Sequence, residues 1–577
     1  MVSRGYIETR SKRVFIGRFA IVTLIIVLIR LKTRNVLNPH ENINDLSKIS
    51  MTKNIIQKPY YHSRNEHFWS SWSLPTSSFW INLGLSSSNT ANQLTNSISG
   101  SNSLNWESPT RPLLGKGITL HDRLKSWRNA PLPEPASWVQ FNLQTCRDEI
   151  IRKNSNSDLL KRAHLMWAKL NSTHIRDKRE ELIGYLEEAD RRGAFSPKNW
   201  GVGRGIVFTA GNVDTFSRVL LTVRMLREHL KCNLPVEIFS FPGEEADSKT
   251  KESLEALNAK LRIIGWAQKD PNRNKNFHIK ASALVTCSFR EPLYLDSDNL
   301  PAVMEPGTIE SLWETKGYKK LGALFWPDYW KTHSDSPIWL LIGTQCRDEW
   351  EQEAGQLLID KSQHLDALLL SEAMLKDWKY WFQLSDGDKD IFRFAMLALR
   401  KRWALPGRYL GAAGLSWNTL TGYCGHTMLQ HDPEGRPLFI HMNLLKLIGS
   451  GISQGSTFKR TRTVDVQLLS NESASDYGVE ADMLANADET GKAIIEAPGP
   501  VRRRAAFERG LKAFFHGGNI SPLCVDIEWQ NPGLEPIDGL VESENPLKIV
   551  QWDDDPRLKA FEDRYYNMGG QTSAVGF

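Results

Sequence analysis

The stretch that decides the fold opens with Gly205-Ile-Val-Phe-Thr-Ala-Gly211 and closes with Glu291-Pro-Leu-Tyr-Leu-Asp-Ser-Asp298. Between these two apolar runs, patterns typical of strands and of amphipathic helices alternate along the chain. We predict strands at 206–208, 236–241, 261–266 and 292–295, separated by helices at 215–230, 248–260 and 279–288. Such alternation builds an α/β fold with a mostly parallel sheet, in which ligands bind outside the carboxyl ends of the strands.

Two carboxylates follow the last of these strands directly. Asp296 and Asp298 are separated by one residue, and side chains two positions apart on an extended segment point to the same side. Such a DxD pair can hold one hard divalent cation, which would neutralise the charge that develops on a nucleoside diphosphate as it leaves a sugar. A short DxD also arises by chance as a solvated acidic turn, but its place at the end of the fourth strand favours a metal site.

One segment near the N-terminus could cross a membrane. It is the apolar run 19–29, which extends to 14–31 if the flanking arginines reach toward the headgroups, and we predict a signal-anchor helix at 19–31. A cleaved signal peptide is the alternative, but the run leads into basic residues instead of a small-residue cleavage site. Five cations precede or enter the run and three follow it, which places residues 1–18 in the cytosol and the rest in the lumen. Sequons at Asn171, Asn471 and Asn519 agree with that topology.

The composition divides the rest of the chain into segments. Residues 32–134 are rich in Ser, Asn and Thr without periodicity, and we predict a low-complexity stem there. Residues 135–200 show helical spacing and are interpreted as a helical collar, 201–450 as the catalytic domain, and 451–577 as a C-terminal extension without an assigned role.

The charge and the cysteines narrow the choice of partners and of compartment. The 577 residues carry 72 basic and 66 acidic side chains, and a net charge of +6 gives no reason to expect a nucleic acid partner. Six cysteines are widely spaced without a CxxC pair, which fits disulfides in an oxidising compartment. Free buried thiols are the alternative, and the fifteen possible pairings stay open.

Several short motifs follow one another along the chain. They are Ile206-Val-Phe-Thr-Ala-Gly211, Val223-Arg-Met-Leu-Arg227, Leu234-Pro-Val-Glu-Ile238, Tyr294-Leu-Asp-Ser-Asp-Asn299, Phe325-Trp-Pro-Asp328, Glu353-Ala-Gly-Gln356, Gly387-Asp-Lys-Asp390, Gln430-His-Asp-Pro-Glu-Gly435 and Phe439-Ile-His-Met-Asn443. In these motifs and their order the chain resembles, from about residue 205 to residue 446, the fungal Golgi alpha-mannosyltransferases of outer-chain mannan synthesis, glycosyltransferase family 71. One position departs from the pattern, because Ala354 stands where the family usually has serine. That difference puts acceptor preference in doubt more than activity.

The resemblance implies a fold and an activity. The fold is the nucleotide-sugar-binding GT-A type, preceded by a single-pass type II membrane anchor and a stem. The activity is transfer of mannose from GDP-mannose, with Mn²⁺ or Mg²⁺ and with net retention, to a mannose-containing glycan of glycoproteins in the Golgi lumen. Whether the new bond is alpha-1,2 or alpha-1,3 stays open.

Residues around the expected cation are assigned to the donor. A small-residue turn at Thr209, Ala210 and Gly211 lets the backbone approach a nucleotide, although it could be a plain turn. His441 follows an apolar strand and could complete the metal site, or it could be a satisfied half-buried histidine. Two lysines could contact the diphosphate, or lie on the surface, and these are Lys280 and Lys446.

The acceptor and the transferred sugar need groups that bind hydroxyls. We assign Glu353 and Asp388 to catalysis, because an oriented carboxylate can accept the proton of an attacking hydroxyl, and leave open which is the base or nucleophile. For acceptor binding we name Gln356, Asp390 and Trp326, the last through stacking on a sugar face.

Two other functions compete with this interpretation. A retaining glycoside hydrolase also needs two carboxylates, but it needs no nucleotide site and no DxD pair. A membrane-tethered glycan-binding homologue that has lost turnover is the second alternative. The Ala354 departure favours it, while the intact Asp296, Asp298 and His441 oppose it.

Overall fold

In this computed structural model the placed residues belong to the second of two compact units, residues 102–577. The described residues are 113, 117–133, 138, 142, 146, 148–267, 269–270, 276–303, 305–415, 422–445, 454–464, 510–516, 524–530 and 545–571. The predicted cytosolic tail, the membrane anchor and most of the stem lie outside them, as do Lys446 and the sequons at Asn471 and Asn519. Among the helices that are described, none has the length and apolar character needed to cross a bilayer.

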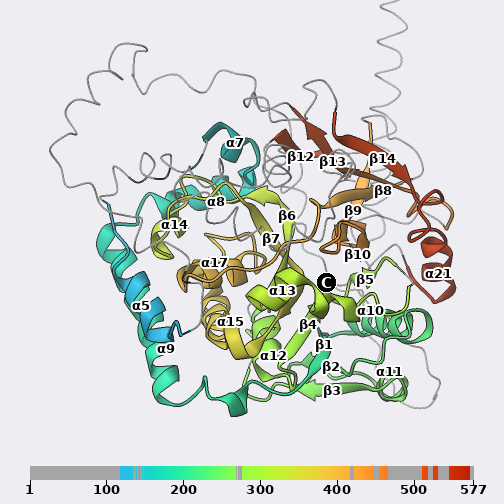
Figure 1. The fold of residues 1–577 in the computed structure, drawn as a ribbon, viewed down its shortest axis with the longest axis horizontal. Coiled ribbons are helices and arrows are strands. Elements are labelled where there is room, and N and C mark those ends of the chain that lie inside the picture. Colours follow the sequence, from blue (N-terminus) through green and yellow to red (C-terminus); the bar gives the residue numbers. More distant parts are fainter. Residues whose placement is uncertain are drawn as a thin grey trace, which may run out of the picture. The chain divides into compact units, whose positions relative to one another are not determined.

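The predicted α/β alternation forms a six-stranded sheet with the order β3-β2-β1-β4-β7-β6 (Figure 1). The four predicted strands are confirmed and run parallel to one another. Two strands that the sequence analysis did not predict, β7 and β6, extend the sheet in antiparallel orientation. The bounds are β1 Arg204–Thr209, β2 Val236–Ser240, β3 Ala259–Ile263, β4 Glu291–Leu295, β6 Ala323–Lys331 and β7 Trp350–Ile359.

The three helices predicted between these strands are also confirmed. Helix α10 (Val213–Arg224) is capped at its N-terminus by Asn212, whose side chain accepts from the Thr215 N–H. The helix continues into a π-helical turn, Met225–His229. Helix α11 (Ser248–Ala256) ends four residues earlier than predicted. Helix α12 (His278–Thr286) leads into β4.

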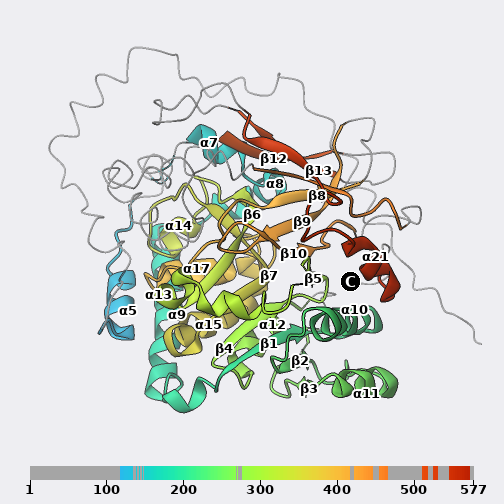
Figure 2. The same cartoon turned by 45° about the vertical axis from the view of Figure 1, so that its right-hand side comes forward.

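The two faces of this sheet pack against different layers, because successive side chains of a strand point to opposite sides. Val207 and Tyr294 belong to a core that contains helices α12 and α15 (Lys361–Lys376). Ile206 and Leu295 belong to a second core, formed with α10 and with strands of a second sheet. Figure 2 shows α15 on one side of the strands and α10 on the other.

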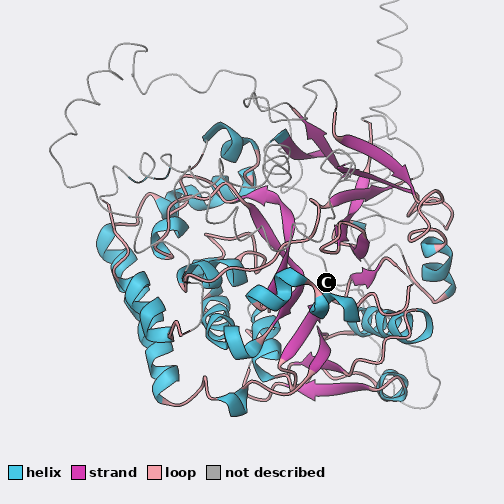
Figure 3. Cartoon of the chain, viewed as in Figure 1, coloured by secondary structure: helices cyan, strands magenta, loops and turns pink. Residues whose placement is uncertain are grey.

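The second sheet has eight strands and was not predicted from the sequence. Figure 3 shows its strands gathered beside the C-terminal helix. Part of the predicted C-terminal extension, residues 451–577, belongs to this sheet, since β11 to β14 are members of it. The bounds are β5 Asn299–Pro301, β8 Gly411–Gly414, β9 Gly425–His431, β10 Pro437–His441, β11 Arg460–Val464, β12 Leu511–His516, β13 Cys524–Trp529, β14 Leu547–Gln551 and α21 Phe561–Asn567.

The residues predicted to form a helical collar contain helices, and the last part of the predicted stem contains one as well. Leu120–Arg128 forms helix α5, which begins with a capping box of Thr119 and Asp122. Trp127 on α5 is fully buried and donates from its ring nitrogen to the Leu341 carbonyl at 2.9 Å. The other helices are α7 Asp148–Lys153, α8 Ser157–Trp167, α9 Ser172–Arg191, α13 Lys316–Leu321, α14 Ile338–Leu341, α16 Trp378–Trp381 and α17 Ile391–Ala398, with short 3₁₀ turns at Pro197–Asn199 and Glu310–Glu314.

Four of the six cysteines form disulfides. Cys146 is bonded to Cys346, and Cys424 to Cys524, which ties the beginning of β9 to β13. Cys232 and Cys287 are free and buried. Both of the alternatives that the sequence left open therefore occur in the same chain.

Candidate active site

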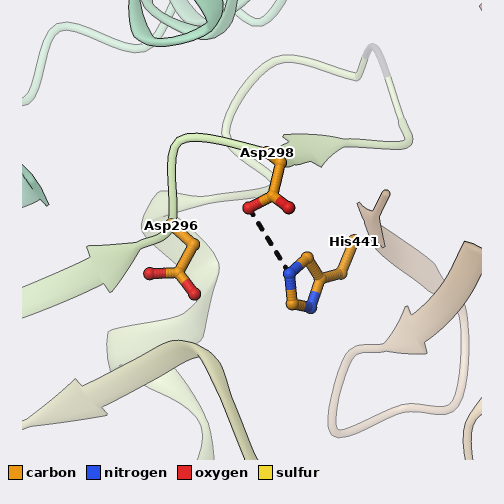
Figure 4. Close-up of side chains that lie close together, drawn as sticks. All are labelled: Asp296, Asp298 and His441. Carbon is orange, nitrogen blue, oxygen red and sulfur yellow. Dashed lines mark ion pairs between the residues drawn. The ribbon is translucent and has the colours of Figure 1, made fainter. Parts of the chain in front are cut away.

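The turn after β4 presents two carboxylates at the carboxyl edge of the first sheet. The Asp296 N–H donates to the Gly355 carbonyl of β7 at 2.8 Å, and the Asn299 N–H closes the turn on the Asp296 carbonyl at 3.0 Å. Strand β5 starts at Asn299 and pairs with β10, so that His441 lies opposite Asn299. The turn and this pairing bring Asp296, Asp298 and His441 together (Figure 4).

These three side chains have the geometry of a cation site. One ligand atom from each lies within 4.8 Å of the others, and the His441 Nε2 lies 3.4 Å from the Asp298 Oδ1. Asp298 and His441 are buried, and Asp296 is partly exposed. Two carboxylates and an imidazole are donors that suit a divalent cation such as Mn²⁺. The three residues predicted as metal ligands are thus placed where they could share one ion.

The charges around this cluster favour a cation. Burial raises the pKa of Asp296, and the neighbouring Asp298 and Asp388 add to the effect although Lys280 opposes it. Burial disfavours the imidazolium, yet the facing carboxylates of Glu353 and Asp298 raise the pKa of His441 well above its ordinary value. A divalent cation bound here would offset the mutual repulsion of these carboxylates.

Glu353, predicted to be catalytic, holds His441 from the other side of the ring. Its Oε1 lies 3.0 Å from the His441 Nδ1 and accepts from the Gly355 N–H at 2.6 Å. Burial opposes ionisation of Glu353, but His441 brings its pKa below the ordinary value. A carboxylate on the second nitrogen of a metal-binding imidazole fixes the orientation of the ring. The geometry therefore points to a positioning role for Glu353.

Gly355 makes this arrangement possible. A Cβ atom at this position would lie 2.8 Å from both the Glu353 carboxylate and the His441 ring. We expect Gly355→Ala to raise the Kd for Mn²⁺ by about 10- to 100-fold, because the imidazole and its carboxylate partner would have to move apart. Isothermal titration with MnCl₂ measures this.

The matched control is Gly184→Ala in helix α9, where a Cβ would meet no atom within 4 Å. This variant should bind Mn²⁺ like the parent and be slightly more stable, since alanine favours a helix over glycine by about 1 kcal/mol. Equal Mn²⁺ affinity in both glycine variants would contradict the role assigned to Gly355.

The cluster opens into a cleft of about 450 Å³. The turn Thr209, Ala210 and Gly211 lines it at the end of β1, as predicted for a nucleotide-binding turn. The Thr209 hydroxyl lies 2.8 Å from the Tyr294 hydroxyl, which donates to the Asp296 Oδ1 at 2.7 Å. Tyr294 was missed by the sequence analysis. Its position on β4, two residues before Asp296, was the available signal.

Lys280 also lines the cleft, but its ammonium group already contacts protein oxygen atoms. It lies 3.2 Å from Asp296 and 2.6 Å from Asp388, and it donates to the Ala354 carbonyl at 2.8 Å. Burial disfavours the charge, but the two carboxylates raise the pKa of Lys280 above its ordinary value. In place of the predicted diphosphate contact, the structure shows a buried cation that holds two site carboxylates.

The segment Gly387 to Asp390 turns its charged side chains in different directions. Asp388 and Lys389 line the cleft, which agrees with the predicted place of Asp388. Asp390 instead points into the protein, where it accepts from the Gln352 N–H at 2.9 Å and pairs with Arg393 at 3.3 Å.

The residues named for acceptor binding do not line the cleft. Asp390, Gln356 and Trp326 are completely buried. Gln356 pairs with Asn299, and the Trp326 ring donates to the His431 carbonyl at 2.7 Å. This is a correction to the prediction, because buried side chains with internal partners cannot touch a sugar in the cleft.

Comparison with known proteins agrees with the resemblance. A family model described as "Mannosyltransferase putative" matches residues 203–342 and 344–432. The chain is similar to alpha-1,2-mannosyltransferase MNN21 of Candida albicans, with 28% identity over 40% of this chain and 43% of the relative. It is also similar to alpha-1,2-mannosyltransferase MNN2 of Saccharomyces cerevisiae, with 26% identity over 44% of this chain and 49% of the relative. The chain thus spans less than half the length of these curated relatives.

Solved structures of glycosyltransferases are similar over smaller parts. The mannosyltransferase Ktr4p of S. cerevisiae in complex with GDP aligns with 12% identity over 36% of this chain and 68% of that chain, with a TM-score of 0.24. Core-mannan synthase A of Aspergillus fumigatus, in its Mn/GDP form, aligns with 9% identity over 34% and 69%, also with a TM-score of 0.24. Scores this low carry no argument about the site. The match to the family model rests on sequence, and the matched residues include Asp296 and Asp298.

Proposed function

We propose that this protein is a metal-dependent mannosyltransferase that moves mannose from GDP-mannose to a mannose-containing glycan with net retention. The observation that carries the proposal is the cluster of Asp296, Asp298 and His441, which lies in a cleft at the carboxyl edge of the sheet. Both aspartates stand in the region that matches the mannosyltransferase family. The parallel arrangement of β3, β2, β1 and β4 supports a GT-A-type fold.

The donor would occupy the side of the cleft near β1. The small-residue turn Thr209 to Gly211 lets a nucleoside approach the backbone, and it is linked to Asp296 through Tyr294. A divalent cation held by Asp296, Asp298 and His441 would supply charge stabilisation for the departing diphosphate. Lys446, which lies outside the described residues, remains a prediction as a phosphate ligand.

Asp388 is the best candidate for catalysis among the cleft carboxylates. It faces the cleft beside Lys280, whereas Glu353 is engaged with His441 and Gly355. An oriented carboxylate at this place can bind the attacking hydroxyl of the acceptor and take its proton.

We also propose that the enzyme is a single-pass type II protein of the Golgi membrane with a lumenal catalytic domain. The apolar run 19–29 and the basic residues before it support this topology. Two disulfides, Cys146–Cys346 and Cys424–Cys524, fit an oxidising lumen.

The test is transfer of labelled mannose from GDP-mannose to an alpha-linked mannobiose, by the purified full-length protein in detergent, with MnCl₂ or with EDTA. We expect a mannotriose product with Mn²⁺ and none with EDTA, and digestion with linkage-specific alpha-mannosidases would assign the bond. Substitution of UDP-glucose for GDP-mannose should abolish product. Protein that binds GDP with Mn²⁺ but transfers no mannose would favour the inactive glycan-binding alternative, and release of free mannose from mannobiose without nucleotide would favour a hydrolase.

A further inference from the structure

A second charged group lines the cleft and has no task in the transfer outlined above. Asp328 comes from β6 and Lys389 from the loop before α17, and their side chains are 12% and 14% exposed. The Lys389 Nζ lies 3.4 Å from the Asp328 Oδ1 and 2.5 Å from the Glu351 Oε2. The strand order β1-β4-β7-β6 places this pair on the opposite flank of Asp296 from the nucleotide-binding turn.

An irregularity in β6 brings Asp328 into the cleft. Strands β6 and β7 pair regularly as far as Phe325, and the register then shifts at Trp326 and again between Pro327 and Lys331. Such bulges bend a strand and re-aim its side chains, and they are frequent beside active sites. The backbone is held in this form, since the Pro327 carbonyl accepts from the Gln430 side chain at 2.9 Å.

Burying the ionised carboxylate of Asp328 at this position destabilises the folded protein when no ligand is bound. Burial raises the pKa of Asp328 to about 6, although Lys389 acts in the opposite direction. Glu353 lies close enough for its charge to act on Asp328 as well. Glu353 is 4% exposed, and its Oε2 has no hydrogen-bond partner among the described residues. Unsatisfied buried oxygens of this kind call for a ligand.

The chemistry of this wall suits a sugar. Carboxylate oxygens accept hydrogen bonds from hydroxyls and an ammonium group donates to them, so neighbouring hydroxyls of a pyranose can use both. We propose that Asp328 and Lys389 form the subsite that binds the hydroxyls of the acceptor mannose, next to the reacting centre. This inference rests on the proposed function and replaces the acceptor roles first given to Gln356, Asp390 and Trp326.

The experiment compares Asp328→Ala and Asp328→Asn with the wild-type enzyme. Both variants should fold, because Lys389 keeps its partner Glu351. At saturating GDP-mannose and Mn²⁺ we expect the KM for mannobiose to rise roughly tenfold or more in Asp328→Ala, as for loss of a buried hydrogen-bond partner. The Kd for mannobiose, measured with GDP and Mn²⁺ present, should rise in parallel, while the Kd for GDP should stay within about twofold.

The control is Asp348→Asn. Asp348 pairs with Lys331, which lies on β6 like Asp328, and both side chains are buried and do not line the cleft. This variant should lower the melting temperature without moving the KM for mannobiose. An unchanged KM in Asp328→Ala, or a GDP affinity that falls in step with it, would overturn the subsite while leaving the transfer activity in place. Failure of the wild-type protein to bind GDP or to transfer mannose would instead sink the proposed function.

Discussion

Asp298→Asn should lower kcat/KM for mannose transfer by about 10³-fold or more. Asparagine has the shape of aspartate but is a poor ligand for a cation, and the charge stabilisation supplied by a metal is worth several kcal/mol in a transition state. The fold should survive, because the Asp298 carbonyl still accepts from the Met442 N–H at 2.9 Å. The measurements are initial rates over a range of MnCl₂ concentrations, together with the Kd for Mn²⁺.

The matched control for this variant is Asp366→Asn. Asp366 is a largely buried carboxylate paired with Lys401 at 2.6 Å, and it does not line the cleft. Its replacement should reduce stability and leave kcat/KM within about twofold. If Asp298→Asn kept wild-type activity, or if wild-type activity survived EDTA, the metal site would be disproved whatever the fate of the control.

Glu349→Gln should lower the free energy of unfolding by about 3–5 kcal/mol. The Glu349 carboxylate lies 3.1 Å from Arg393, 3.1 Å from Arg402 and 3.3 Å from Arg347, and all three arginines are buried. Removing the carboxylate charge leaves these guanidinium groups without their shared anion in the interior. Urea unfolding followed by tryptophan fluorescence gives the difference.

An exposed pair provides the contrast. Glu187→Gln removes the surface contact of Arg128 and Glu187 at 2.9 Å, and we expect a loss of no more than about 1 kcal/mol. Similar losses in the two variants would show that burial of the Glu349 cluster does not matter.

The contribution of Glu349 to the free energy of unfolding should decrease as the pH falls. Burial opposes its ionisation, but Arg402, Arg347 and Arg393 hold the pKa of Glu349 well below its ordinary value. A lowered folded-state pKa stabilises the protein above the unfolded value of about 4.3, and that stabilisation is lost as the pH falls toward the folded value. The difference in the free energy of unfolding between the wild type and Glu349→Gln should therefore become smaller as the pH falls from about 4 to about 2.

Local patterns predicted the four parallel strands of the first sheet, because each of these strands carries its own apolar signal. Apolar runs at 206–208 and 292–295 gave the buried strands, and the Asp296 and Asp298 pair gave the cation site at the strand end. By contrast, Trp326 stands in a motif with Asp328, and both could have faced a ligand. The register shift in β6, which buries Trp326 and turns Asp328 into the cleft, depends on pairing with β7 and has no local signal.

The sequence by itself determined the α/β alternation, the position of the DxD pair and the similarity to mannosyltransferases, because these depend on residue spacing within short segments. The tertiary structure alone decided the contacts between distant segments. It placed His441 next to Asp298 through the pairing of β10 with β5, and Glu353 on the other side of the imidazole ring. It also paired Lys280 with the two carboxylates of Asp296 and Asp388. Finally, it paired four of the six cysteines in two disulfides and left Cys232 and Cys287 as free thiols. Such contacts follow from long-range strand pairing and packing, whose geometry is fixed only when the whole domain folds.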